Sequence, residues 1–135
     1  MRIERVEITK EQFVQLHIDA LGKFEDHILI DVYLAYDGDR VIGFGSTQAT
    51  TSTTMFIRSI GFTKDVMDND TREQKVAYLT EAFSIIRGWG FKFITGFIEN
   101  TNSKAIIWGT KAGFKIVGLR SRGASPALLE IILEV

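Results

Sequence analysis

The stretch Phe91–Leu119 constrains the fold of this chain more than any other. Its aromatic and β-branched residues predict a strand over Phe91–Ile98. After a polar turn, Asn102 is suited to cap a helix that ends before Gly113, a residue type that tolerates the left-handed conformation found at helix ends. A second strand is then predicted over Phe114–Leu119. This unit predicts a domain that mixes strands and helices.

The first predicted helix starts at a capping box. Thr9 and Gln12 have the spacing at which each side chain can bond the backbone amide of the other. A strand is predicted before this helix, over Arg2–Ile8, and Gly22 is expected to end it. His17 lies beside the apolar face, where a histidine can be functional, structural or solvated. The apolar face consists of Phe13, Leu16, Ala20 and Leu21.

An Asp-Gly turn predicts a β-hairpin in the next part of the chain. The apolar runs Ile28–Tyr36 and Val41–Thr47 flank the turn residues Asp37–Arg40, and such a turn between apolar runs is a strong hairpin signal. Met55–Phe62 predicts a third strand of the same meander, reached through the Thr- and Ser-rich connection Thr50–Thr54.

A long helix is predicted to follow a polar loop at Thr63–Thr71. Its start fits either Thr71 with Gln74 or Asp70 with Glu73. Apolar residues at three- and four-residue steps predict a face that packs on the sheet. They are Val76, Leu79, Phe83 and Ile86.

The last apolar run, Ala127–Val135, predicts a largely buried strand after a turn at Ser121–Pro126. If this strand lay at an edge of the sheet, it could pair across a homodimer. No linker or internal repeat divides the 135 residues, so one domain is expected to span residues 1–135.

Composition excludes several kinds of function. The chain has no cysteine and two histidines, which excludes thiolate chemistry and makes a metal site unexpected. The net charge of -1 provides no general attraction for nucleic acid or an anionic membrane. A charged N-terminus and the lack of an apolar run of ~20 residues favour a cytoplasmic protein without a membrane span.

A signature in the second half of the chain resembles the GCN5-related N-acetyltransferases (GNAT). It consists of Asn102 and Ala105 followed by Lys111–Phe114 and Val117–Gly118. The predicted order β-α-β-β-β-α-β-α-β-β resembles that family's core over nearly the whole chain, with the family's second short helix expected near Lys23–His27. The resemblance implies an α/β fold of the α+β type. It would be a single domain with a mixed, mostly antiparallel sheet of about seven strands, splayed between strands 4 and 5, and with helices on both faces.

The resemblance also implies that acetyl-CoA binds in the splay as co-substrate. The pantetheine arm would pair with the backbone of the fourth strand, at residues such as Ile60 and Phe62. Asn102 would help to order the cofactor arm. The diphosphate would lie at the start of the following helix, where unpaired amides and the helix dipole favour an anion.

That helix start departs from the family's Gln/Arg-x-x-Gly-x-Gly/Ala loop. Arg72 matches the first position and Ala77 fits the last, but Lys75 replaces the central glycine. Lys75 could contact a phosphate as a point charge, or it could be a solvated helix lysine. Four carboxylates nearby would oppose a diphosphate. They are Asp65, Asp68, Asp70 and Glu73.

The catalytic residues do not follow from the resemblance. The tyrosine that protonates the leaving thiolate in many family members aligns with Gly109, next to Trp108, which is expected to lie in the core or a groove. The glutamate that often acts as base has no counterpart in Met55–Phe62. Glu99 and Asp65 are the candidates for a base, because both are expected near the carboxyl ends of strands; solvated loop carboxylates are the alternative.

Two functions are therefore predicted. The first is an N-acetyltransferase that moves an acetyl group from acetyl-CoA to an amine of a small molecule or peptide. The second is a non-catalytic protein of the same fold, for example of a phage type, that has lost cofactor binding and serves as a binding or structural module. No pattern in the sequence indicates the acyl acceptor.

Overall fold

The computed structural model describes residues 1–22, 31–47 and 51–134. Compared with the predicted order, the chain contains one additional short helix, α2. The elements are, in chain order, β1 (Arg2–Val6), α1 (Lys10–Leu21), β2 (Asp31–Asp37), β3 (Arg40–Thr47), β4 (Thr54–Phe62), α2 (Lys64–Asn69), α3 (Arg72–Gly88), β5 (Phe93–Glu99), α4 (Ser103–Lys111), β6 (Lys115–Arg122) and β7 (Ser125–Glu134).

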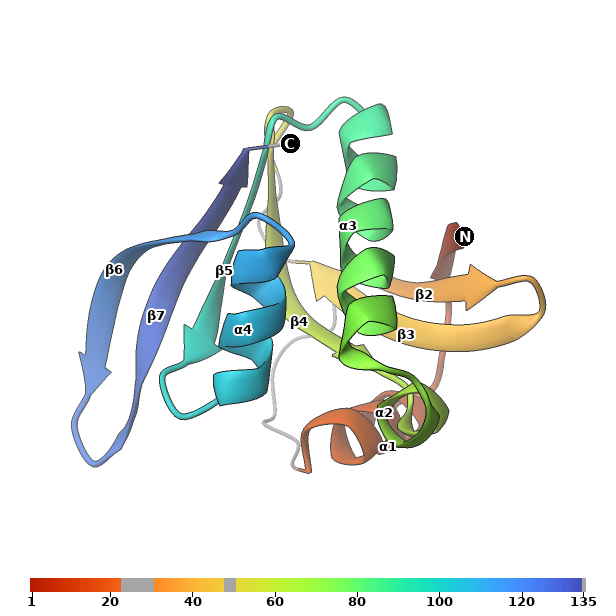
Figure 1. The fold of residues 1–135 in the computed structure, drawn as a ribbon, viewed down its shortest axis with the longest axis horizontal. Helices are drawn as coiled ribbons and strands as arrows, with labels where there is room; N and C mark the ends of the chain where they lie inside the picture. The colour runs from red at the N-terminus through yellow and green to blue at the C-terminus, as the bar shows by residue number, and fades with distance from the viewer. Residues whose placement is uncertain (23–30, 48–50, 135) are drawn as a thin grey trace.

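The seven strands form one mixed sheet in the order β1-β2-β3-β4-β5-β7-β6 (Figure 1). Only the pairing of β4 with β5 is parallel, and the other neighbours are antiparallel. The predicted mixed, mostly antiparallel sheet is therefore confirmed. None of the helices in the described part of the chain is long and apolar enough to cross a membrane.

Helices cover both faces of the sheet. Phe62 of β4 packs with Val66 of α2 and Tyr78 of α3 in one apolar cluster. A Cβ atom on the neighbouring Gly61 would instead lie 2.8 Å from the Cβ of Ala20 in α1. Because consecutive strand residues point to opposite faces, α1 packs on the face opposite to α3.

The sheet opens between the second half of β4 and the end of β5. Residues 54–57 of β4 pair with residues 93–96 of β5, and beyond this point β3 is the only described strand that pairs with β4. In Figure 1 the two strands diverge towards the start of α4. The predicted splay is thus present, and it begins at Arg58.

A β-bulge at Arg58 changes which residues of β4 face each helix layer. Thr47 of β3 pairs with Ile57, and the adjacent Ser46 pairs with Ser59, so Arg58 is an extra residue in β4. Met55 therefore faces the α3 side before the bulge, whereas Ser59 lies on the α1 side after it.

The predicted caps are present at three helix starts. Thr9 and Gln12 form the capping box, with hydrogen bonds of 3.1 and 2.9 Å between side chains and amides. Thr71 caps α3, so of the two proposed starts the one at Thr71 is confirmed. Asn102 caps α4 by accepting from the amide of Ala105 at 3.2 Å.

The packed face of α3 differs from the prediction in its first turns. Phe83 and Ile86 are buried as predicted, whereas Lys75 and Tyr78 are buried in place of Val76 and Leu79, which are partly exposed. The first turns pack against α2 and α4 as well as the sheet, and this rotates the buried face. Long amphipathic side chains can fill such a position because their polar tips bond at its edge; the Tyr78 hydroxyl donates to Asp37 at 3.0 Å.

The prediction of a loop over residues 63–71 is wrong, because residues 64–69 form helix α2. The Thr63 side chain caps it, and Val66 is fully buried against the sheet. Burial of Val66 and the cap at Thr63 stabilise a short helix whose polar composition had indicated a loop. The expected helix near Lys23–His27 and the first residues of the predicted strand at Ile28 lie outside the described residues.

The last strand does not lie at an edge of the sheet. β7 sits between β5 and β6, and the edge strands are β1 and β6. Strands β6 and β7 extend further than predicted, to Arg122 and from Ser125, so that the turn between them contains only residues 123 and 124. The condition for pairing this strand across a homodimer is therefore not met, because both of its edges are occupied within the chain; a homodimer through another surface stays a prediction.

Candidate functional site

A cavity of about 660 Å³ lies where β4 and β5 separate. Residues of β3, β4 and β5 line it, together with residues of α1 on one face and of α3 and α4 on the other. Because α1 and α3 lie on opposite faces, the cavity passes through the opening in the sheet. Its volume is within the range of small-molecule sites.

The exposed edge of β4 forms one wall of this cavity. Ile60 and Phe62 both line it, and their backbones pair on the other side with Gly45 and Gly43 of β3. Among the described strands, none pairs with the second edge of β4 beyond residue 57. Backbone amides and carbonyls on this edge are therefore positioned to bind an extended ligand.

Helix α4 forms the opposite wall. Asn102, which caps the helix, lines the cavity, as does Trp108. Gly109 is buried, and a Cβ atom there would lie 3.3 Å from Cδ2 of Phe114. The position that aligns with the family's tyrosine is thus in close contact with Phe114, and Trp108 lies in the groove as predicted.

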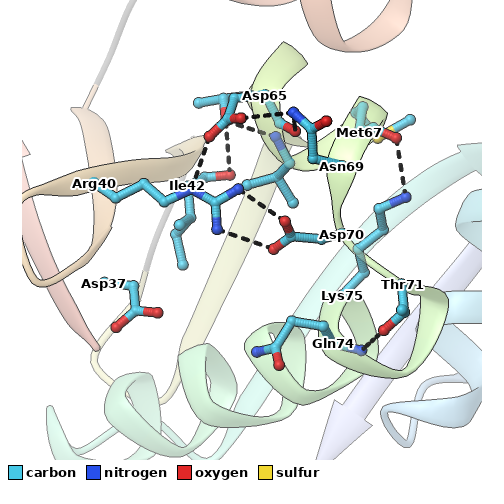
Figure 2. Close-up of polar contacts among 12 residues, drawn as sticks. Asp37, Arg40, Ile42, Asp65, Met67, Asn69, Asp70, Thr71, Gln74 and Lys75 are labelled. Atoms are coloured by element: carbon cyan, nitrogen blue, oxygen red, sulfur yellow. Dashed lines mark hydrogen bonds and ion pairs between the residues drawn. The ribbon is translucent and has the colours of Figure 1, made fainter.

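The start of α3 lies beside the cavity but does not line it. None of Arg72, Lys75 and Ala77 is among the lining residues, although all three lie in the first turns of the helix. The Thr71 hydroxyl accepts from the amide of Gln74 at 3.1 Å (Figure 2). These predicted cofactor residues therefore lie next to the cavity wall.

Lys75 is buried, with 8% of its surface exposed, so the interpretation of a solvated helix lysine is wrong. Its Nζ donates to the carbonyl of Met67 at 3.3 Å (Figure 2) and lies 5.1 Å from the centre of the Trp108 ring. The carbonyl and the aromatic face stabilise the ammonium group. Because Met67 and Trp108 line the cavity, Lys75 lies directly behind its wall.

Most of the carboxylates near the start of α3 are paired. Figure 2 shows the guanidinium of Arg40 between Asp65, at 2.7 Å, and Asp70, at 2.8 Å. Lys64 pairs with Asp68 at 2.5 Å. The hydrogen bonds from Arg40 and then from Asn69 lower the pKa of Asp65, and in turn Asp70 and Asp65 raise the pKa of Arg40. The expected repulsion of a diphosphate is therefore partly compensated.

The two candidates for a base lie in different places. Asp65 does not line the cavity, and its paired carboxylate with a lowered pKa is unsuited to accept a proton. Glu99 lies at the end of β5 and lines the cavity, with its carboxylate 3.7 Å from Nη2 of Arg122. Within residues 1–22, 31–47 and 51–134, no group of three or more Asp, Glu or His side chains is placed to hold a metal ion.

A hydrogen-bonded chain of three side chains on the α1 side was not predicted. His17 Nε2 lies 3.0 Å from Oγ of Ser59, which lies 2.6 Å from Oγ of Ser46, and all three residues line the cavity. His17 was noted in the sequence, but nothing there connected it with the two serines. The three residues come from α1, β4 and β3, and they meet only because the bulge at Arg58 turns Ser59 towards α1.

The fold is shared with solved acetyltransferases. No family model matches this sequence, and no curated protein matches it. An acetyltransferase from Bacillus subtilis in complex with CoA matches with a TM-score of 0.69 at 17% identity, over 99% of this chain and 98% of that chain. The ribosomal-protein-S18-alanine N-acetyltransferase of Escherichia coli matches with a TM-score of 0.71 at 13% identity, over 98% and 92% of the two chains.

A GNAT family acetyltransferase from Elizabethkingia anophelis with acetyl-CoA bound is also similar. Its TM-score is 0.64 at 14% identity, and the match covers 99% of this chain and 97% of that chain. Identities this low establish the shared architecture. The chain therefore has the fold of the GNAT acetyltransferases over nearly its whole length.

Proposed function

We propose that this chain is an N-acyltransferase of the GNAT type, which transfers an acetyl group from acetyl-CoA to an amine. The observation that carries the proposal is the cavity of about 660 Å³ at the separation of β4 and β5, with the open edge of β4 along its wall. Two structures of the same fold contain CoA or acetyl-CoA. Acetyl-CoA is accordingly the proposed co-substrate, and its supply fits the predicted cytoplasmic location.

The cofactor would bind along β4 and reach the start of α3. The amides of the pantetheine arm would pair with the backbone at Ile60 and Phe62, and Asn102 would contact the arm from α4. The diphosphate would lie at the first turns of α3, near Arg72, with Ala77 leaving space. Lys75 would reach it by exchanging its single 3.3 Å hydrogen bond to Met67 for a charged phosphate oxygen.

In the proposed reaction the neutral amine attacks the thioester carbonyl. The C–N bond forms, the C–S bond breaks, and CoA leaves as a thiolate that is then protonated. Amides of β4 would hold the carbonyl oxygen, and the cavity would hold the two reactants in contact. Gly109 offers no acid, so water would protonate the thiolate. Of the two carboxylates predicted as a base, Glu99 lines the cavity and Asp65 does not.

The acceptor is proposed to be a primary amine of a small molecule or a peptide. The name of the Escherichia coli relative describes acetylation of a protein amine, which supports a peptide as one class of acceptor. An amine can enter from the α1 side, because the cavity also has walls on that face of the sheet.

Calorimetric titration with acetyl-CoA, and with desulfo-CoA as a control for thiol reactivity, tests the proposal. We expect binding in the micromolar range, followed by acetyl transfer in a screen of primary amines. No detectable heat at millimolar cofactor would contradict the proposal. It would favour the alternative of a non-catalytic protein of this fold, with the opening as a groove for a partner.

The substitution Lys75→Met tests the diphosphate site. Methionine keeps the buried aliphatic stem, so the fold should persist, while the affinity for acetyl-CoA should fall about tenfold through loss of one charged contact. Acetyl-pantetheine, which lacks the diphosphate, should bind both proteins equally.

Lys111→Met removes an exposed lysine from the last turn of α4 and serves as the control, since it should change neither affinity. Unchanged binding of acetyl-CoA to Lys75→Met would remove Lys75 from the site. An equal loss for both ligands would assign Lys75 to the wall of the cavity instead of to the diphosphate.

A further inference from the structure

We propose that His17 is the proton acceptor for the amine, and that the proton reaches it through Ser46 and Ser59. The proposal rests on the acetyl transfer proposed above and names the residues that make the amine nucleophilic. It is carried by three contacts on the α1 side of the cavity, which join α1, β4 and β3.

The contacts of His17 fix the position of its ring proton. Nδ1 lies 2.8 Å from the carbonyl oxygen of Phe13, which can only accept a hydrogen bond, so Nδ1 carries a proton. In the neutral imidazole, Nε2 then has the free electron pair. The contact of 3.0 Å between Nε2 and Ser59 is consequently a bond in which the Ser59 hydroxyl donates.

The direction of the second bond follows from the first. The single hydroxyl proton of Ser59 is used towards His17, so Ser46 must donate in the contact of 2.6 Å between the two hydroxyl oxygens. All donors in the chain therefore point towards Nε2. The oxygen of Ser46 retains its own accepting capacity at the outer end of the chain, and this serine lines the cavity.

Such a chain suits an amine that arrives protonated. An alkylamine is largely an ammonium ion near neutral pH, as lysine is, and it must lose one proton before it can attack a thioester. An ammonium N–H can donate to the Ser46 oxygen. The opposite wall has Glu99, but this carboxylate already faces Arg122.

The surroundings of His17 can accommodate the charge that it would take up. The ring of Phe13 lies 4.2 Å and that of Phe44 lies 4.9 Å from the imidazole, centre to centre. Aromatic rings attract a cation, and the Phe13 carbonyl strengthens its bond to Nδ1 when the ring becomes charged. Only 2% of the His17 surface is exposed, so bulk water does not compete for Nε2.

The proposed reaction moves one proton to His17 and the acetyl group to the amine. The ammonium gives one proton to the Ser46 oxygen, the Ser46 proton passes to Ser59, and the Ser59 proton passes to Nε2 of His17. The neutral amine forms the C–N bond with the acetyl carbon, and the electron pair of the C–S bond goes to sulfur. The nitrogen releases its second proton to water, and water protonates the thiolate. The products are an amide, CoA thiol and an imidazolium, which later returns its proton to water.

The variant His17→Gln separates proton transfer from hydrogen bonding. The glutamine amide oxygen can accept from Ser59, but it cannot take up a proton. With acetyl-CoA and the best amine from the screen, we expect kcat to fall about a hundredfold, in the usual range for loss of a general base. The KM for the amine, the affinity for acetyl-CoA and the melting temperature should change little.

Two serine variants and one control complete the test. Ser59→Ala interrupts the chain and should lower kcat to a similar degree, whereas Ser59→Thr keeps a hydroxyl and should restore most of it. Gln15→Ala, on the exposed face of the same helix, should leave kcat unchanged. Nitrogen-15 NMR of the imidazole should show a proton on Nδ1 and none on Nε2 in the resting protein.

The outcomes distinguish this inference from the proposed function. If the unaltered protein binds acetyl-CoA but acetylates no amine, the proposed function fails and the relay fails with it. If transfer occurs and His17→Gln retains full kcat, the relay alone is wrong and the chain only holds α1 on the sheet. A resting imidazole protonated on Nε2 would overturn the direction of the chain, and with it the role of His17.

Discussion

Two polar networks flank β4 on opposite faces, and they differ in charge and in burial. On the α1 side, His17, Ser59 and Ser46 form a chain without formal charge, in which His17 is 2% exposed and Ser46 is 3% exposed. On the α3 side, Arg40 joins Asp65 and Asp70, and the side chains of Arg40, Asp65 and Asp70 are 35%, 55% and 11% exposed.

The two networks are suited to different roles: the charged one holds helices in place, and the other is proposed to transfer a proton. The charged network fixes α2 and the start of α3 to β3. Its charges persist because an arginine stays protonated and the lowered pKa of Asp65 keeps that carboxylate ionised. The chain on the α1 side contains an imidazole, whose Nε2 can accept a proton, and two hydroxyls that can pass one on. Burial of His17 and Ser46 shields the proposed proton-transfer chain from bulk water, whereas exposure lowers the cost of the charges on Arg40 and Asp65.

The largest effect on the neutral side is expected from Gly61→Ala. The new Cβ would lie 2.8 Å from both the Cβ of Ala20 and Cε1 of Phe44, so α1 must move away from β4. We expect a loss of about 2–3 kcal/mol in the free energy of unfolding, measured by denaturant titration, as in overpacked cores. Acetyl transfer should also fall, because His17 moves with α1.

Gly88→Ala is the matched control, since a Cβ atom there has no neighbour within 4 Å and alanine favours the helix. It should leave stability unchanged or raise it slightly. Equal stability of Gly61→Ala and the unaltered protein would mean that α1 does not pack closely on β4.

A smaller effect is expected from Ser59→Val, which removes the hydroxyl that bonds both His17 and Ser46. We expect a loss of about 1–2 kcal/mol, the usual cost of buried polar groups left unsatisfied. Adding His17→Phe removes one of these groups, so the double variant should recover part of the loss. A double-variant cycle measured by thermal unfolding checks this, and additive losses would show that the two side chains do not interact.

The smallest effect is expected from Arg40→Met on the charged side, because solvent screens the pair of Arg40 with Asp65, whose side chain is 55% exposed. Most of the loss should come from Asp70, whose side chain is 11% exposed. The sign of its pH dependence follows from Asp65. Its pKa is lowered in the folded protein, so its contribution is present above the unfolded value of 3.8 and is lost as the pH falls further.

The stability difference between Arg40→Met and the unaltered protein should therefore shrink between about pH 7 and about pH 3, and also in ~1 M salt. Denaturant unfolding of both proteins at about pH 7, at about pH 3 and in ~1 M salt measures this difference. Ser59→Val serves as the comparison, because its effect should not depend on salt. If the stability difference between Arg40→Met and the unaltered protein changes with neither salt nor pH, the electrostatic account of this network is contradicted.

Local signals in the sequence predicted the elements of the fold well. The capping box at Thr9, the cap at Asn102 and the Asp-Gly hairpin are decided by residues within one turn of each other, and the structure contains all three. The mixed sheet and its splay were predicted through the resemblance to the GNAT family, which rests on the order of these elements and on the signature that begins at Asn102. Helix α2 was missed because its one buried residue, Val66, is surrounded by polar ones.

The site was less predictable, because it depends on register. Ser46 and Ser59 are opposite each other only once β3 and β4 are aligned, and the bulge at Arg58 has no residue signature that distinguishes it. The burial of Lys75 depends on Trp108, which lies on another helix. Contacts between distant segments decide these positions, and the periodicity within one segment carries no information about such contacts.

The position of β7 has a consequence for how the protein is made. β7 lies between β5 and β6 but follows both in the chain, and β6 pairs with no other described strand. While the ribosome is still adding residues before β7, β6 has no strand to join, and the cluster around Ile94 lacks Leu133. This half of the sheet can therefore be completed only after β7 has left the exit tunnel, and until then the apolar cluster around Ile94 stays incomplete.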